Sequence, residues 1–189
     1  MKSYKKRDFP VERARRILEP GPIVLVSSAY RGETNIMTMG WHTVMEFAPS
    51  LVGGVIADSN HSFGLIRKSK ECVINVPAAH LADAVVRIGN STGGEIDKFE
   101  ACGLTAEKAV SVAAPLVREC FASFECRLHD ARLVRDYNFF IFEIVKAHVA
   151  AVPKYPQTLH YHGQGVFTGD GKIVNKARQF TKWRGSPVF

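Results

Sequence analysis

The chain lacks several features that would assign it quickly to a class. No apolar run reaches the roughly 18 residues that a membrane-spanning helix needs. The basic segment 1–16 has no apolar centre of the kind found in signal peptides, so we expect a cytoplasmic protein with no membrane partner. Low-complexity segments and internal repeats are also missing. With 46% hydrophobic and 23% charged residues, the 189-residue chain is predicted to form one domain, 1–189.

Cysteine is scarce, and its spacing excludes the common cysteine motifs. The four cysteines, Cys72, Cys102, Cys120 and Cys126, include no Cys-x-x-Cys pair. A zinc knuckle and a thioredoxin motif are therefore unsupported. Cys72 and Cys120 lie in apolar contexts and are predicted to be small buried side chains. His160 and His162 would share one face of a strand, but no third ligand is evident, so no metal site is predicted.

The net charge of +7 does not by itself indicate a nucleic-acid partner. Lysine and arginine are scattered, with clusters only near the two ends, at 2–7 and 176–184. No RNA-binding or helix-turn-helix signature accompanies them. We interpret the charge as a solvated basic surface and expect no nucleic-acid partner.

A Gly-x-Gly-x-x-Gly turn and a regular alternation of strands and helices are both absent, which argues against a doubly wound α/β fold. Instead, β-type segments predominate. They are predicted over 23–28, 35–43, 51–57, 71–76, 116–133 and 139–150. Helices are predicted over 11–18, 62–70 and 79–89, with a short one beginning at 97. This pattern favours a mainly β fold, an antiparallel barrel with inserted helices.

Glycines and turn residues refine this picture. Gly53 and Gly54, inside the strand predicted over 51–57, indicate that other groups approach the backbone closely there. Residues 136–138 are predicted to form the turn between two long strands. A further hairpin is predicted over 163–174, with its turn at 168–171.

One polar segment is suited to phosphate. Ser59, Asn60, His61 and Ser62 follow a strand and begin a helix, and the amino end of a helix presents free N–H groups and a positive dipole end. Hydroxyl, amide and imidazole groups could add further hydrogen bonds. The alternative is simple capping of the helix by Ser62 or Asn60.

A second segment is suited to a planar ring. Thr38, Met39, Gly40 and Trp41 offer backbone N–H groups beside a glycine, where no side chain blocks approach, together with an aromatic face. Alternatively, Trp41 and Met39 pack a core strand, and the nearby Asn35 is only a turn residue. Lys98 could place a cation near the ring, or it could be an exposed lysine at a helix start.

Taken in order and spacing, several segments resemble one family, the flavin reductase-like FMN-binding split barrels, and in particular their flavoredoxin-type branch. The resemblance extends over about residues 22–174. The matching segments are Asn35–Val44, Asn60–Lys68, Glu71–Pro77, Asp97–Phe99, Gly103–Thr105, Pro115–Cys120 and Glu125–Cys126. The resemblance implies a six-stranded antiparallel split barrel, usually a homodimer that binds FMN near the subunit interface.

The resemblance also implies roles for individual residues. Those expected to line the flavin ring and its edge are Asn35, Thr38, Met39, Gly40 and Trp41, with Lys98 and Phe167 near the ring. Asn60, His61 and Ser62 would approach the phosphate and ribityl chain, with Ser59 beside them. Tyr137 stands where members often carry histidine; it can donate a hydrogen bond but does not protonate near neutral pH. Phe142 replaces a small glycine of the family.

These features predict an FMN-binding oxidoreductase that takes electrons from NADH, NADPH or a protein donor and passes them to an acceptor. The cofactor carries the chemistry, so no nucleophile–base pair is required, and we assign no catalytic residue. One alternative is an electron carrier without its own nicotinamide site that works between partner proteins. Another is a non-catalytic binding module for a different ligand such as haem.

Overall fold

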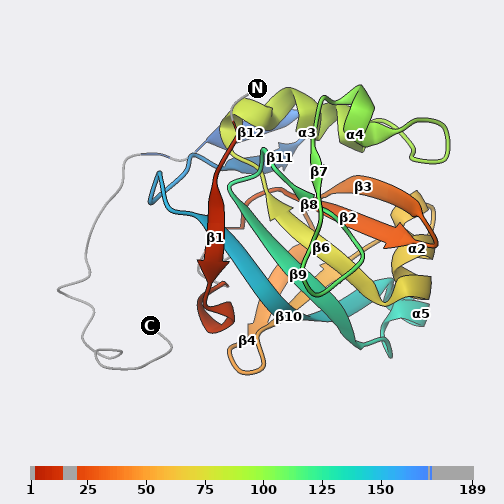
Figure 1. The fold of residues 1–189 in the computed structure, drawn as a ribbon. Coiled ribbons are helices and arrows are strands. Elements are labelled where there is room, and N and C mark those ends of the chain that lie inside the picture. Colours follow the sequence, from red (N-terminus) through yellow and green to blue (C-terminus); the bar gives the residue numbers. More distant parts are fainter. Residues whose placement is uncertain (1–2, 15–20, 170, 172–189) are drawn as a thin grey trace.

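A curved antiparallel sheet dominates the computed structural model, which describes residues 3–14, 21–169 and 171 (Figure 1). Eight strands of this described part form the sheet. Their order is β3 (Glu33–Met39), β2 (Val24–Tyr30), β6 (Glu71–Val76), β9 (Ala122–Asp130), β10 (Phe139–Ala150), β5 (Leu51–Val55) and β4 (His42–Glu46), and β1 (Lys6–Phe9) also pairs with β10. β3 and β4 end the order without pairing to each other, so the barrel is split there.

The mainly β class is confirmed, but the sheet has eight strands rather than six. One extra strand, β1, comes from the basic segment near the beginning of the chain. The other arises because the strand predicted over 35–43 breaks at Gly40 and Trp41 into β3 and β4. Alternating side chains of β2, β3, β6 and β10, such as Val24, Met37 and Phe140, meet in the apolar core inside the barrel.

Helices cover the barrel on two sides. α2 (His61–Ser69) turns Phe63, Leu65 and Ile66 inward, because its apolar residues recur at helical spacing. α3 (Ala82–Gly89) follows the 3-10 turn η2 (Ala79–Leu81) and packs with α4 (Lys98–Ala101) against the outer face of β2 and β3. α5 (Val134–Tyr137) precedes β10, and the 3-10 turn η1 (Val11–Arg13) follows β1. None of the described helices has the length and apolar content required to cross a membrane.

The helices predicted over 62–70 and 79–89 and the short one beginning at 97 are confirmed with shifted boundaries. Of the helix predicted over 11–18, η1 is described, and residues 15–18 lie outside the described part. The segment 116–133 contains β8 (Leu116–Val117) and β9, separated by a turn. The turn predicted at 136–138 is the end of α5, with Asn138 in the left-handed conformation.

The last predicted hairpin is displaced along the chain. It pairs β11 (Leu159–Gly163) with β12 (Val166–Gly169), and its turn lies at 164–165 rather than at 168–171. Gln164 and Gly165 both have positive φ angles, which allows the tight reversal there. Residues 170 and 172–174 of the predicted span lie outside the described part.

Close approach explains the glycines of β5. A Cβ atom added to Gly53 would lie 2.2 Å from the ring of Phe139, and one added to Gly54 would lie 3.1 Å from the sulfur of Met39. The prediction of close contacts at these glycines is thus confirmed. Phe142 is fully buried and its ring stacks with that of Phe140 at 5.7 Å, so the core accommodates the larger side chain.

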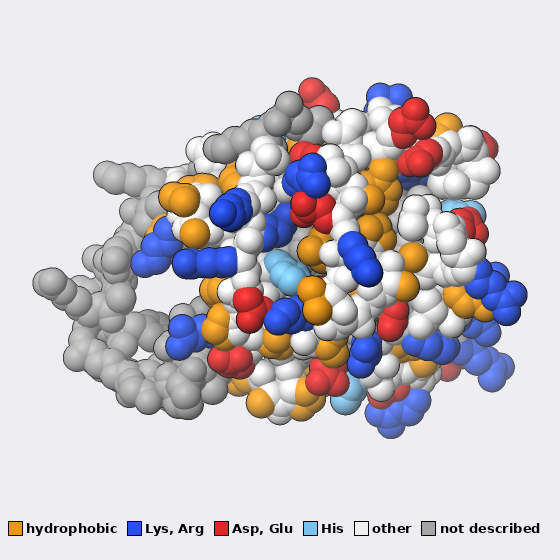
Figure 2. Space-filling view, in the orientation of Figure 1, with side chains coloured by type: hydrophobic (Ala, Val, Ile, Leu, Met, Phe, Trp, Pro, Cys, Tyr) orange, Lys and Arg blue, Asp and Glu red, His pale blue; other side chains and the backbone are white. Residues whose placement is uncertain are grey.

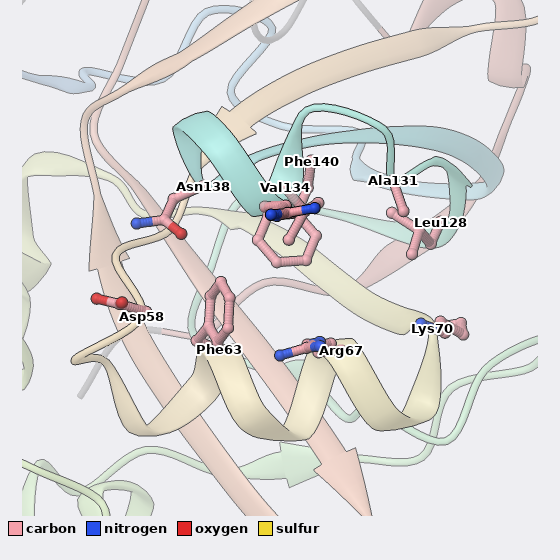
Figure 3. Close-up of a pocket in the computed structure, with 10 residues that line it drawn as sticks. Asp58, Phe63, Arg67, Lys70, Leu128, Ala131, Val134, Asn138 and Phe140 are labelled. Atoms are coloured by element: carbon pink, nitrogen blue, oxygen red, sulfur yellow. The ribbon is translucent and has the colours of Figure 1, made fainter.

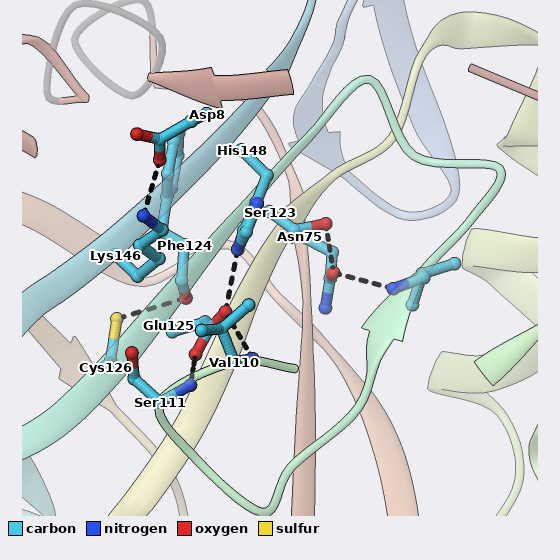
Figure 4. Close-up of polar contacts among 11 residues, drawn as sticks. Asp8, Asn75, Val110, Ser111, Ser123, Phe124, Glu125, Cys126, Lys146 and His148 are labelled. Atoms are coloured by element: carbon cyan, nitrogen blue, oxygen red, sulfur yellow. Dashed lines mark hydrogen bonds and ion pairs between the residues drawn. The ribbon is translucent and has the colours of Figure 1, made fainter. Parts of the chain in front are cut away.

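A buried polar network holds the segment between β7 (Ala106–Glu107) and β9 against the sheet (Figure 4). The Glu125 carboxylate accepts hydrogen bonds from the N–H groups of Val110 and Ser111 and pairs with His148 at 2.7 Å. Asn75 Oδ1 accepts bonds from Ser123 Oγ at 2.7 Å and from a backbone N–H at 3.0 Å. Cys72 and Cys120 are fully buried as predicted, and burial raises the pKa of both thiols.

Candidate functional site

Two predicted residues from distant parts of the chain meet at the start of α2. Asn35, on β3, donates a hydrogen bond from Nδ2 to Ser62 Oγ at 2.9 Å. Ser28 Oγ on β2 donates to the same oxygen at 3.2 Å. All three side chains are buried, so this cluster fixes α2 to the sheet edge formed by β2 and β3. The Ser62 hydroxyl therefore has internal partners in this chain.

The loop after α3 closes over this cluster. A Cβ atom added to Gly93 would lie 2.1 Å from Oδ1 of Asn35, far inside van der Waals contact. Only glycine lets the loop backbone reach the Asn35 amide at this point. The neighbouring Gly94 lies beside His61, where an added Cβ atom would be 3.6 Å from Nδ1. The loop thus joins β3 to the first turn of α2.

His61, the first residue of α2, forms a short ion pair and hydrogen bond with Glu33 of β3 through Nε2. The contact orients the imidazole beside the amino end of the helix. It also places one carboxylate near a point at which we expected an anion. The helix dipole adds a positive field at this end of α2.

The amino end of α2 has no side-chain cap. Asn60 occupies the N-cap position, yet in the described part of the chain its side chain accepts no hydrogen bond from the first turn. The alternative interpretation, in which Asn60 or Ser62 simply caps the helix, is therefore not what the structure shows. The Phe63 N–H donates to the Asn60 carbonyl at 2.9 Å, but no hydrogen bond within the described residues takes the N–H groups of His61 and Ser62, so these two are suited to an anionic ligand.

Two more predicted residues meet around the carboxyl end of α3. The Thr38 hydroxyl of β3 donates to the Val85 carbonyl at 2.7 Å. Lys98, at the start of α4, is only 6% exposed and donates from Nζ to the Ile88 carbonyl at 2.9 Å. It is therefore not the exposed lysine of the alternative interpretation. Burial lowers the pKa of Lys98, and the nearby Cys102 thiol partly opposes this shift.

The other residues predicted to line the flavin ring lie where β3 ends and β4 begins. Met39 is buried with its sulfur near β5, and Gly40 is exposed. The Trp41 carbonyl accepts a hydrogen bond from the Val55 N–H at 2.9 Å, while its indole is 76% exposed. Trp41 therefore does not pack a core strand, and its ring surface is open on this chain.

The other predicted residues are more scattered. Ser59 is exposed and Asn60 half-buried in the turn before α2. Tyr137 is 69% exposed at the end of α5, whose next residue, Asn138, bonds through its carbonyl to the Ile56 N–H after β5. Phe167, on β12, packs against Tyr161 with ring centres 4.9 Å apart. In the described part of the chain, no hydrogen bond, ion pair or ring contact joins Tyr137 or Phe167 to the Asn35–Ser62 cluster.

A cavity of about 420 Å³ lies between α2 and α5 (Figure 3). Its lining includes Asp58 and Asn138, which immediately neighbour the predicted residues Ser59 and Tyr137 in the chain. None of the twelve predicted site residues lines it, however. The cavity is therefore a separate feature from the residues that converge around β3.

Sequence reasoning missed three contributors to this arrangement: Ser28, Glu33 and Gly93. A serine pair inside the apolar strand 23–28 was a usable signal for Ser28, because a buried hydroxyl needs a partner. Glu33 carries no comparable signal, since a charged residue in a turn is usually solvated. In the sequence, Gly93 indicates only a break between two elements, and the folded chain is what brings it next to Asn35.

Comparison with known proteins agrees with the family resemblance of the sequence. Residues 15–170 match the model of the family described as "Flavin reductase like domain". The uncharacterized protein YddH of Escherichia coli (strain K12) is 30% identical over 184 residues, covering 89% of this chain and 97% of that protein.

Solved structures share the fold. An FMN-binding domain of a flavin reductases-like enzyme from Shewanella baltica aligns with a TM-score of 0.85 at 24% identity, covering 93% of this chain and 99% of that one. Flavoredoxin of Desulfovibrio vulgaris (Miyazaki F) aligns with a TM-score of 0.75 at 21% identity, covering 83% of this chain and 90% of that one.

Proposed function

Because this chain belongs to the family of flavin reductase like domains, we propose that it binds FMN and acts as an oxidoreductase. In this proposal, electrons come from NADH, NADPH or a protein donor and leave to an acceptor that the chain does not identify. Bound FMN would supply the redox chemistry, since its ring accepts and releases electrons or hydride. The protein's own residues bind the cofactor, orient it and tune its electrostatic surroundings.

The phosphate is assigned to the amino end of α2. The uncapped first turn supports this assignment, because its N–H groups and the helix dipole favour an anion. Ser59 and Asn60 precede this turn and carry exposed or half-exposed polar side chains. His61 and Ser62 begin it, with their side chains positioned by Glu33 and by Asn35, respectively. We propose that these four residues hold the phosphate and ribityl end.

The ring is assigned to the β3 side of the molecule. Asn35, Thr38 and Met39 lie along β3, and Gly40 and the exposed Trp41 indole follow its end. Lys98 would stand near the ring edge. Tyr137 and Phe167 complete the proposed set; their separation from the Asn35–Ser62 cluster is consistent with a site that a second subunit completes.

The buried ammonium of Lys98 is the observation that carries the proposal. An ammonium has three N–H donors, and in the described residues its hydrogen bond goes to one carbonyl, that of Ile88. A buried cation is costly without an anionic or strongly polar partner. A flavin edge that accepts hydrogen bonds and gains negative charge on reduction would supply such a partner.

We further propose a homodimer with FMN near the subunit interface. Among the described residues β4 is an end strand of the sheet with one unpaired edge; its Met45 is 44% exposed, and the strand adjoins the exposed Trp41. Unpaired strand edges with apolar side chains favour association with another chain. A second copy seated on this edge would cover Trp41 and leave the flavin enclosed between the two subunits.

The absorbance spectrum of the purified full chain tests the proposal. We expect flavin absorbance bands that persist through gel filtration or return when FMN is added to the colourless protein. Chromatography of the released cofactor identifies FMN, FAD or riboflavin. A colourless protein that takes up no flavin contradicts the proposal, and a haem Soret band would establish the non-catalytic alternative instead.

The electron donor is tested with the flavin-loaded protein under anaerobic conditions. Bleaching by NADH or NADPH, followed by turnover with added acceptor, supports the reductase. Because the fold is similar to that of a flavoredoxin, the same test has a second informative outcome. A flavin that dithionite reduces but neither nicotinamide reduces would assign the chain as a carrier between redox partner proteins.

A further inference from the structure

The cavity between α2 and α5 combines an apolar floor with a basic rim. Phe63 rises from α2 toward Phe140, their rings meeting edge to face at 5.4 Å (Figure 3). Val134, Leu128 and Ala131 extend this apolar surface. The volume of about 420 Å³ lies within the range of small-molecule sites. The floor is therefore suited to a compact apolar body rather than to an extended chain.

Three cations border this floor, against one carboxylate. Arg67 comes from α2, Lys70 directly follows that helix, and Arg135 comes from α5; Asp58 stands at the other end of the cavity, beyond Phe63 (Figure 3). Within the described residues, neither Arg67 nor Lys70 forms an ion pair. Arg135 contacts Asp136 at 3.8 Å, but its side chain is almost fully exposed, so that pair neutralises little of its charge.

The surroundings strengthen the basic character. Lysine and arginine side chains gather at the edge of the molecule where α2 and α5 lie (Figure 2). Arg132, just before α5, is also exposed, although its guanidinium pairs with the Asp130 carboxylate. Such a concentration of one sign raises the local concentration of anions. A fully apolar ligand would gain nothing from this rim, and a cationic one would be repelled.

We propose that this cavity, called the groove below, binds an organic oxyanion: a carboxylate or a phosphate ester carried on a compact aromatic body. The aromatic part would lie on Phe63, Leu128 and Val134, with the fully buried Phe140 beneath them. The oxyanion would face Arg67 and Lys70, away from Asp58. Arginine suits this role because its planar guanidinium donates paired hydrogen bonds to carboxylate and phosphate oxygens. The groove shares no lining residue with the proposed FMN site, so this inference does not depend on flavin binding.

Fluorine NMR of the purified full chain tests the proposal with three probes: para-fluorobenzoate, para-fluorophenyl phosphate and the neutral para-fluorobenzyl alcohol. We expect concentration-dependent shifts for at least one anion and much weaker binding of the alcohol. The two anions distinguish a carboxylate from a phosphate ester. Absence of binding by both anions, or equal binding of the neutral probe, would overturn the proposal.

Matched variants locate the binding site. Arg67→Gln should raise the dissociation constant of the anion roughly fivefold, the upper range for an exposed charge pair. Asp58→Asn should lower it about twofold by removing a repulsive charge. Lys68→Gln is the control, since it removes the same charge from α2 at a residue whose Nζ lies over the Tyr30 ring, 5.7 Å from its centre. Equal effects of Arg67→Gln and Lys68→Gln would mean that the anion binds a general basic surface, which contradicts a site in the groove.

Discussion

At the scale of single residues, Lys98 combines a structural and an electrostatic role that can be separated. Its Nζ supports the carboxyl end of α3 by binding the Ile88 carbonyl, and its charge is held in a nearly buried position. Lys98→Gln removes the charge and keeps a donor, whereas Lys98→Met removes both. We expect both variants to lower the flavin midpoint potential, because a cation stabilises the reduced, anionic ring.

The two variants should differ in stability. Lys98→Met should lose about 1–2 kcal/mol relative to Lys98→Gln, since it leaves a buried carbonyl without its donor. Redox titration and thermal unfolding measure the two effects on the same samples. Lys108→Gln, at an exposed position, serves as the control. An unchanged potential in both Lys98 variants would contradict the proposed location of the ring.

At the scale of elements, the loop at Gly93 joins β3 to α2. Gly93→Ala would place its Cβ atom against the Asn35 amide and displace the Asn35–Ser62 hydrogen bond. We expect a loss of about 1–3 kcal/mol in unfolding free energy, as for other overpacked sites, together with weaker FMN binding. Gly94→Ala is the matched control, because its Cβ atom would meet only ordinary contact distances. If both variants behave alike in chemical denaturation and flavin titration, the loop does not act through Asn35.

Two carboxylates hold the segment between β7 and β9: Glu71 accepts a hydrogen bond from the Ala113 N–H at 2.9 Å, and the buried Glu125 accepts from two further N–H groups. Burial raises the pKa of Glu125, but hydrogen bonds from Val110, His148 and Ser111 outweigh that effect, and the net pKa is lowered. A lowered folded-state pKa contributes stability above the unfolded pKa, about 4.3 for glutamate, and that contribution disappears as the pH falls through the folded value. We therefore expect stability to decline as the pH falls below about 4.5.

Urea unfolding between about pH 7 and pH 3 measures this dependence. Glu125→Gln should be less stable at neutral pH and should show a flatter acid decline. Glu143→Gln removes an exposed carboxylate, 3.8 Å from His129, and should leave the profile nearly unchanged. Parallel profiles for Glu125→Gln and the unaltered chain would contradict this role for Glu125.

At the scale of the whole molecule, the free β4 edge predicts how the proposed dimer and the flavin are linked. Met45→Lys should place a charge in the interface and shift the chain toward monomer in sedimentation equilibrium. Because the flavin is proposed to lie near the interface, its affinity should fall in parallel. Val110→Lys alters an equally apolar side chain, 74% exposed, away from this edge and serves as the control. If Met45→Lys made the dimer dissociate but left the flavin affinity unchanged, the flavin would not lie near the interface.

Much of this architecture follows from local sequence. The β-branched run at 23–28 and the strand 71–76, stopped by Pro77, form where their side-chain chemistry and turn residues indicate. Asp97 caps α4 through the N–H groups of Phe99 and Glu100, as an aspartate at a helix start predicts. The break at Gly40 and Trp41 was not predicted, because the apolar pattern continues across it while the pairing partner changes from β2 to β5.

The sequence by itself determined the antiparallel β class and the segments that could meet a phosphate and a ring, since these depend on side-chain alternation and on residues that begin helices. Only the tertiary structure decided that Ser62 turns inward to Asn35, that Lys98 is buried against α3, and that Trp41 remains exposed. It alone also brought Arg67, Lys70 and Arg135 around one apolar floor. Contacts between residues far apart in the chain arise from sheet order and helix placement, and no local pattern records them.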